Sequence, residues 1–198
     1  IAEQSIANLG RWPWPRETQA RMLDLLAAGH AKVVGNTAFF FEPQVDAGLA
    51  YINKIGALLE ASTLKNISDP EHQTDLAQLN ALLQEASQSL DNDRKFGDSM
   101  AKANDALLAM FFELGEPQGK PDKPLPDYVI KNALVNVKGD AGGDLPMLSA
   151  GVHVPVEVLG SRAVAIGHLN AAPDVDGGIR TEPLVVEDIG STNGTLVS

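Results

Sequence analysis

The sequence predicts an α/β fold with a mainly parallel central sheet, flanking helices, a helical insertion and a C-terminal β-hairpin. Two short apolar runs, Lys32–Phe41 and Ala106–Phe112, are nearly uncharged, as strands buried on both faces are. Each follows a segment with helical spacing, and this order is typical of layered α/β folds. The hairpin is expected from Asn193-Gly194, which favours a two-residue turn between Val185-Val186 and Leu196-Val197.

The chain before the first predicted strand is expected to be helical. Ser5–Leu9 has the apolar spacing of one or two helical turns. A longer helix is expected over Pro15–Ala28, because proline suits the first turn of a helix and Gly29 can end the last one. The expected order is therefore two helices followed by the strand Lys32–Phe41.

The region between the two predicted strands is expected to be a helical insertion over about residues 46–104. Asp46 can cap a helix over Ala47–Ala61, in which apolar residues recur every three or four positions. After the polar break Ser68-Asp69-Pro70, a second helix with the same spacing extends through Leu90. The apolar stripes predict a helical hairpin that packs on itself or on a partner subunit, which leaves a homodimer open.

The last third of the chain has weaker signals. Gly115–Asp127 holds four prolines and two glycines, which is typical of an irregular surface crossing. Tyr128–Val137 fits either a strand or a helix. Ala163–Leu169 is apolar, and Ile179–Ile189 alternates enough to predict a strand.

The composition excludes several functional classes. The 198 residues include 15 Lys and Arg and 26 Asp and Glu, a formal net charge of −11, so no overall basic field attracts nucleic acid. The absence of cysteine excludes disulfides, thiolate nucleophiles and Cys-ligated metals. No apolar run reaches the roughly 18–20 residues that span a bilayer. We therefore expect no nucleic-acid partner, and a domain truncated at both ends, with any targeting segments outside these residues.

Two sets of short motifs resemble catalytic or metal-binding motifs. Phe96-Gly97-Asp98-Ser99 resembles the serine block of SGNH-type esterases, and Asp69 and His72 resemble their aspartate–histidine block, but the two blocks stand in reversed order here. Asp174-x-Asp176-Gly177 resembles a calcium loop, but Pro183 occupies the position of the bidentate glutamate. We interpret these motifs as helix ends and a turn, and expect no catalytic residues, no metal and no cofactor.

Three further blocks, taken together, resemble the second-type CHASE domain, a sensory extracellular domain associated with cyclases and histidine kinases. They are Leu9–Arg16 (LGRWPWPR), Val33–Pro43 (VVGNTAFFFEP), and the pair Ile166–Asn170 and Pro173–Leu184. The resemblance implies one sensor domain over residues 1–198, on the periplasmic face of the bacterial inner membrane. It implies a transmembrane receptor whose cytoplasmic output is a kinase or a cyclase. It implies no particular ligand, and the acidic residue common early in the second strand of the family is replaced within Gly35-Asn36-Thr37.

The signature residues of these blocks are interpreted as structural rather than as ligand contacts. Aromatic residues between prolines pack well, and arginines in an acidic domain pair with local carboxylates. The signature residues are Arg11, Trp12, Trp14, Arg16, His168, Asn170, Asp174, Asp176 and Arg180.

A binding site for the signal, an unknown small molecule or protein, is expected where the first strand ends. Ligands of open α/β sheets collect at the carboxyl ends of strands. The strand Lys32–Phe41 would deliver Glu42, Gln44 and Asp46 to that edge. Two alternatives stay open: an α/β hydrolytic enzyme that uses Glu42 or Asp46, and a scaffold or adhesion domain that binds proteins through the helical insertion.

Overall fold

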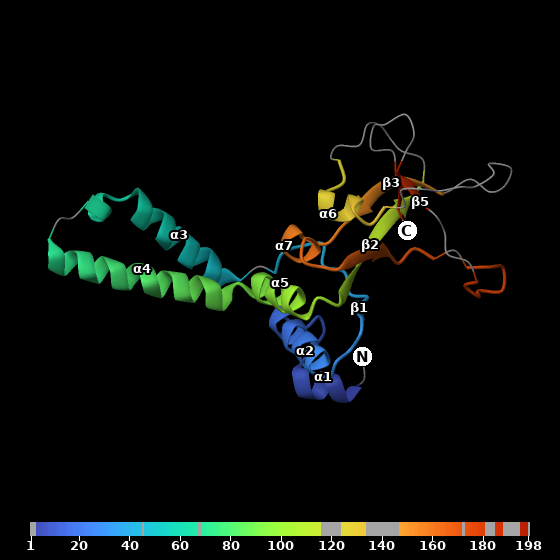
Figure 1. Ribbon diagram of the computed structural model, residues 1–198, viewed down its shortest axis with the longest axis horizontal. Coiled ribbons are helices and arrows are strands. Elements are labelled where there is room, and N and C mark those ends of the chain that lie inside the picture. Colours follow the sequence, from blue (N-terminus) through green and yellow to red (C-terminus); the bar gives the residue numbers. More distant parts are fainter. Residues whose placement is uncertain are drawn as a thin grey trace.

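The molecule consists of a body built around a sheet and a long helical arm that projects from it (Figure 1). The computed structural model describes residues 3–44, 46–66, 69–115, 124–133, 147–171, 173–180, 185–187 and 195–197. The arm comprises the helices α3 (Ala47–Ala61) and α4 (Pro70–Leu90) and the short 3-10 helix η1 (Thr63–Asn66) between them. The other described elements form the body, so the α/β class is confirmed.

The first two helices form as expected. They are α1 (Glu3–Leu9) and α2 (Arg16–Ala28), and α2 begins directly after Pro15. At its end, the Gly29 N–H donates to the Leu25 carbonyl at 3.0 Å and the His30 N–H donates to the Ala27 carbonyl at 2.9 Å, which closes the last turn. The helix buries Leu23 against the body.

The first strand is much shorter than predicted. Strand β1 covers only Val34–Asn36, whereas the prediction extended to Phe41. The Asn36 side chain accepts a hydrogen bond from the Ala38 N–H at 3.0 Å, and a local turn of this kind competes with ladder pairing. The three phenylalanines that follow therefore belong to a loop, in which Phe40 is buried and Phe39 is 46% exposed.

Strand β2 (Ala106–Leu114) is the centre of the sheet, and the prediction of a strand at Ala106–Phe112 is confirmed. Along one of its edges it pairs first with β1, in parallel, and then with β3 (Met147–His153), antiparallel. Along the other edge it pairs in parallel with β4 (Ala165–His168). The sheet continues from β3 to β5 (Val185–Glu187), in parallel, and from β5 to β6 (Thr195–Val197), antiparallel.

The sheet is therefore mixed, and the prediction of a mainly parallel sheet is corrected. The prediction used only the apolar runs that became β1 and β2, and these two strands are parallel to each other. Where β3 pairs with β2, Val152 packs against the core whereas the next residue, His153, is exposed. Antiparallel pairs tolerate such one-sided burial, whereas parallel strands are usually covered on both faces. The antiparallel pairing of β5 and β6 confirms the C-terminal hairpin, although Asn193-Gly194 lies outside the described residues.

The core of the body lies between the sheet and four helices. They are α2, α5 (Asn92–Ala103), α6 (Asp127–Ile130) and α7 (Glu157–Gly160), and α6 shows that the chain is helical at Tyr128. The largest fully buried side chains include Phe96, Met100, Met110, Phe112 and Leu159.

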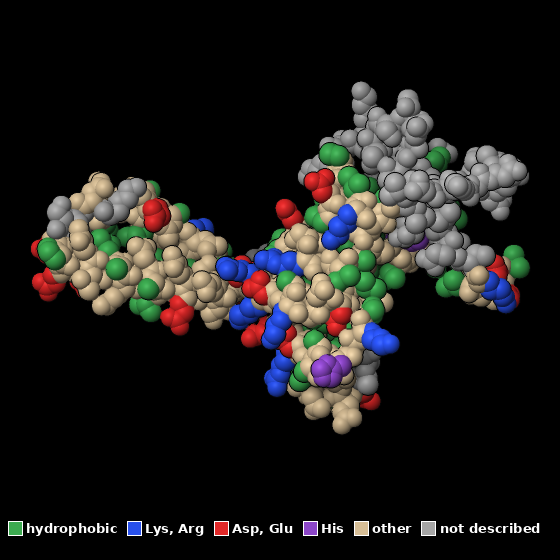
Figure 2. Space-filling view, viewed as in Figure 1, with side chains coloured by type: hydrophobic (Ala, Val, Ile, Leu, Met, Phe, Trp, Pro, Cys, Tyr) green, Lys and Arg blue, Asp and Glu red, His purple; other side chains and the backbone are tan. Residues whose placement is uncertain are grey.

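Helix α5 belongs to this core, although the predicted insertion extended to residue 104. Phe96 and Met100 on α5 are buried in the body. A Cβ added at Gly97 would lie 2.7 Å from the backbone oxygen of Val158, so α5 and α7 pack with their backbones close together. Only α3, η1 and α4 project. Figure 2 shows the charged side chains that gather where the arm joins the body.

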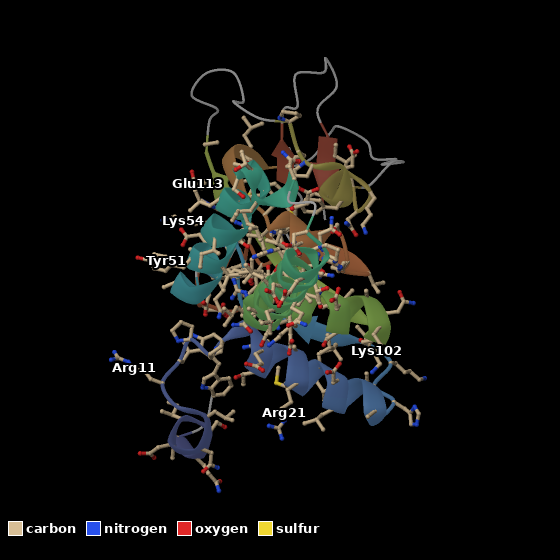
Figure 3. The ribbon with its side chains drawn as sticks, turned by 90° about the vertical axis from the view of Figure 1, so that its left-hand side faces the viewer. Arg11, Arg21, Tyr51, Lys54, Lys102 and Glu113 are labelled. Atoms are coloured by element: carbon tan, nitrogen blue, oxygen red, sulfur yellow. The ribbon has the colours of Figure 1, made fainter. Side chains whose placement is uncertain are left out.

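The arm is capped at its helix starts and has no buried residue in either helix. Asp46 accepts a hydrogen bond from the Leu49 N–H at 2.9 Å, which confirms the predicted cap of α3. Asp69 accepts one from the Glu71 N–H at the start of α4. On the outer face of α3, Tyr51 and Lys54 project away from the ribbon (Figure 3), with the Lys54 amine 5.3 Å from the centre of the Tyr51 ring.

Candidate functional site

A cleft of about 660 Å³ lies where the segment before α2, the loop after β1 and the end of β3 meet. Its volume is within the usual range of small-molecule sites. The residues that line it are Pro13, Trp14, Pro15, Arg16, Phe39, Phe41, Glu42, Pro43, Gln44 and His153.

The three residues proposed for ligand binding have different positions. Glu42 and Gln44 line the cleft, whereas Asp46 is not among the lining residues and caps α3. The Glu42 side chain is exposed and makes no hydrogen bond or ion pair with any described residue. The Gln44 side-chain oxygen accepts from the Arg16 N–H at 2.7 Å, and the Gln44 N–H donates to Asp93 Oδ2 at 2.8 Å. Glu42 is thus available to a ligand, whereas Gln44 holds the loop in place.

Arg16 lines the cleft and has its charge satisfied within the protein. Its Nε lies 2.9 Å from Asp93 Oδ1, with side-chain exposures of 14% for Arg16 and 9% for Asp93. The guanidinium carbon lies 4.4 Å from the centre of the Phe40 ring, and Nη2 donates to the Glu42 carbonyl at 2.9 Å. This arrangement joins α2, the loop after β1 and α5.

A stack of three rings forms one wall of the cleft. The ring centres of Phe39 and Phe41 are 4.7 Å apart, and those of Phe41 and His153 are 5.3 Å apart, with interplanar angles of 25° and 28°. His153 Nε2 lies 2.6 Å from Glu113 Oε1, so a carboxylate from β2 stands behind the stack.

The opposite wall is built by the segment before α2. Trp14 packs edge to face on Trp12, with ring centres 5.4 Å apart, and its indole N–H donates to the Gly10 carbonyl at 2.9 Å. Arg11 points away from the body (Figure 3). Trp14 also lines a second cavity of about 360 Å³ between α1 and α2, whose other lining residues include Leu9, Met22 and Leu25.

The remaining signature residues lie away from the cleft. His168 is buried, with its ring centre 5.6 Å from that of Phe112. The Asn170 carboxamide accepts from the Phe112 N–H at 2.9 Å and donates to the Phe112 carbonyl at 2.8 Å. The Asn170 side chain therefore makes the two hydrogen bonds to β2 that the backbone of a longer β4 would otherwise make.

The turn at Asp174–Gly178 is held by its own residues. The Asp174 N–H donates to the Gly178 carbonyl at 2.8 Å, and the Gly178 N–H donates to Asp176 Oδ1 at 3.0 Å. Arg180 bonds to Asp174 at 2.7 Å and to both carboxylate oxygens of Asp176 at 2.8 Å. The Arg180 hydrogen bond, helped by the Gly178 N–H, lowers the pKa of Asp176 below its ordinary value.

The esterase-like motif is not assembled into a site. Asp69 caps the start of α4 and His72 stands in its first turn, whereas Ser99 lies on α5 in the body, beyond the other end of α4. Within the described part of the chain, no three side chains of the kinds that bind metals gather closely enough to hold an ion. The described helices also include none with the length and apolar character needed to cross a membrane.

Sequence reasoning missed part of the cleft. The sequence predicts Phe39–Phe41 as part of a buried strand, because three identical apolar residues show no alternation between buried and exposed positions. His153 and Glu113 gave no signal, since each is an ordinary polar residue at the end of a strand. The glutamate at 42 was found because it directly follows an apolar run.

Comparison with known proteins supports the resemblance. No curated protein matches the chain, and neither does any solved structure. The CHASE2 domain model matches residues 1–196, which is nearly the whole chain. Because this match includes the residues of the cleft and of the sheet, the chain belongs to the CHASE2 domain family.

Proposed function

We propose that this chain is the signal-input domain of a bacterial membrane receptor, and that a small-molecule signal binds in the cleft of about 660 Å³. CHASE2 domains are sensory extracellular domains, and the family match covers residues 1–196. The proposed place is the periplasmic side of the inner membrane, with membrane segments in the flanking chain and a kinase or cyclase as output. The domain itself is proposed to sense rather than to catalyse.

The meeting of two family blocks in one cleft is the observation that supports this site. Pro13–Arg16 of the first block line it together with four residues of the second block, namely Phe39, Phe41, Glu42 and Pro43. The third block stays outside, where Asn170 completes the sheet. Two distant parts of the sequence that characterise the family thus build one concave surface, as a ligand site requires.

The cleft is also connected to the base of the arm. Gln44 lines the cleft, and its backbone N–H donates to Asp93 in the first turn of α5, three residues after the end of α4. Asp46, two residues beyond Gln44, caps α3. A ligand that shifts this loop would therefore act directly on both chain segments that enter the arm.

The proposal is tested by screening the purified domain against a small-molecule library and recording the rise in melting temperature. A ligand that binds the folded state and not the unfolded state raises the melting temperature, and the rise grows with the logarithm of the ligand concentration relative to Kd. We expect Glu42→Ala to fold normally and to lose the rise, and the arm variant Glu60→Ala, an exposed carboxylate outside the cleft, to retain it. Ligands that stabilise both variants equally would place the site elsewhere.

Testing the receptor role requires the natural polypeptide that contains this domain. We expect the same ligand to change the kinase or cyclase activity of that polypeptide in membrane preparations, and Glu42→Ala to abolish the change while leaving basal activity intact. An output that responds to the ligand equally in both proteins would contradict the proposed site.

A further inference from the structure

We infer that the cleft takes a small organic cation, an amine or quaternary ammonium with an apolar body. This inference rests on the proposed function, because it names the chemical class of the signal for the same site. Three properties of the lining support it: an unpaired carboxylate, a broad aromatic surface and a lining held in place before the ligand arrives.

The first property is the balance of charge. Among the described residues, Arg16 is the only arginine or lysine that lines the cleft, and Asp93 neutralises it at 2.9 Å. The Glu42 carboxylate, in contrast, has no partner among the described residues. Glu113, which is not among the lining residues, is engaged by His153 Nε2 at 2.6 Å and adds no free charge to the lining. The surplus charge of the lining is therefore negative, and it complements a cation.

The second property is the aromatic surface. Phe39 is 46% exposed although it is a large apolar side chain, and it ends a stack that continues through Phe41 to His153. Trp14 faces the same cleft from the other wall. An apolar ligand body would remove this surface from water, and ring faces also attract ammonium groups directly. A purely polar cation such as a metal ion would leave the rings unused.

The third property is pre-organisation. Pro13, Pro15 and Pro43 line the cleft and restrict the backbone on both sides of it. Gln44 is held by two hydrogen bonds, to Arg16 and to Asp93. A lining that is already ordered loses little conformational freedom on binding, which favours a small ligand with few contacts.

The test compares three probes with one apolar body and three different head groups. They are 2-phenylethylamine, 2-phenylethanol and 3-phenylpropionate, titrated into the purified domain by calorimetry near neutral pH. We expect the amine to bind roughly tenfold more tightly than the alcohol, the size of one hydrogen bond to a charged group. The carboxylate probe should bind most weakly, because it meets Glu42.

Matched variants assign the preference to the cleft. Glu42→Gln keeps the size of the side chain and removes its charge, so the amine should lose its advantage over the alcohol. Phe41→Leu should weaken both probes together, since it removes aromatic surface and leaves the carboxylate. Glu60→Gln, the same change on the arm, should alter neither. Circular dichroism of each variant verifies that it is folded.

The outcomes separate this inference from the proposed function. If the alcohol or the carboxylate probe binds as tightly as the amine, or none binds at millimolar concentration, the cationic class is wrong. The proposed site survives that result if a library ligand of another class binds and loses affinity in Glu42→Ala or Phe41→Leu. If a library ligand binds and neither variant affects it, the proposed site is wrong as well.

Discussion

The body and the arm hold their helices in different ways. In the body, α5 has only two large apolar residues, Phe96 and Met100, and both are fully buried. In the arm, α3 and α4 together have far more apolar residues and bury none of them completely. The outer face of α3 leaves Tyr51 and Leu58 67% and 72% exposed. The number of apolar residues in a helix therefore does not tell whether the helix is part of a core; burial of those residues does. The arm has no core because two helices alone cannot enclose one.

Removing a large core side chain should have the largest effect on stability. Phe96→Ala is expected to lower the free energy of unfolding by about 3–5 kcal/mol, because it leaves a cavity next to the sheet. The matched arm variant Leu58→Ala should change it by no more than about 0.5 kcal/mol, since the side chain is already in water. Urea denaturation measures both, and equal losses would show that the outer face of α3 is covered in solution.

Adding a methyl group to a glycine should have opposite effects in the two regions. In Gly97→Ala, the new Cβ would lie 2.7 Å from the Val158 backbone oxygen, so we expect a loss of about 1–3 kcal/mol. In Gly56→Ala, nothing lies within 4 Å, and replacing glycine inside helix α3 should stabilise it by about 0.5–1 kcal/mol. Thermal melts show whether each variant is more or less stable than the original protein. Destabilisation by Gly56→Ala would indicate that another group lies close to Gly56 on the arm.

Excising the arm should leave the stability of the body nearly unchanged. The two helices start and end close together, since a Cβ on Gly48 would lie 3.2 Å from Leu90 Cδ1. A short Gly-Ser linker can therefore replace residues 47–90. We expect the far-ultraviolet helical signal to fall and the near-ultraviolet spectrum and melting temperature of the body to remain. Collapse of the body would show that the arm is needed for its fold.

An exposed turn of the body should behave as the arm does, with an effect that stays local. Arg180→Ala removes the main cause of the lowered pKa of Asp176, so that pKa should rise toward its ordinary value in an NMR titration. The lowered pKa stabilises the turn above the unfolded pKa, and this contribution is lost as the pH falls through the folded pKa. Near neutral pH, the variant should therefore have a less stable turn, while the stability of the rest of the body should not change. An unchanged pKa would mean that Arg180 does not engage Asp176 in solution.

The sequence predicts those features that depend on local rules. The Asp46 cap, the end of α2 at Gly29 and the strand β2 all follow from a short stretch of chain and are confirmed. What it could not predict depends on contacts between distant segments. The end of β1 depends on which strand next occupies the edge of β2, and that strand is β3, more than 100 residues later.

The candidate site shows the same division. Glu42 could be found from its place after an apolar run, but the ring stack needs His153, which the fold brings to Phe41. Likewise, α5 is too polar to be recognised as part of a core, since only Phe96 and Met100 mark its buried face. Predicting the ring stack would require knowing the antiparallel register of β3 on β2. Predicting the place of α5 would require knowing how it packs on α7.

The single residue between α4 and α5 gives the arm the geometry of a mechanical lever. Asp91 ends α4 and also accepts the hydrogen bond from the Arg94 N–H that starts α5, so the pivot is one residue long. Helix α4 has 21 residues and is therefore about 32 Å long. A rotation of about 10° at the pivot would move its far end by about 5 Å, the length of one helical turn. A small movement of the chain beside Gln44 would thus become a much larger movement at the far end of α4. A movement of that size is enough to make or break a contact with a neighbouring molecule.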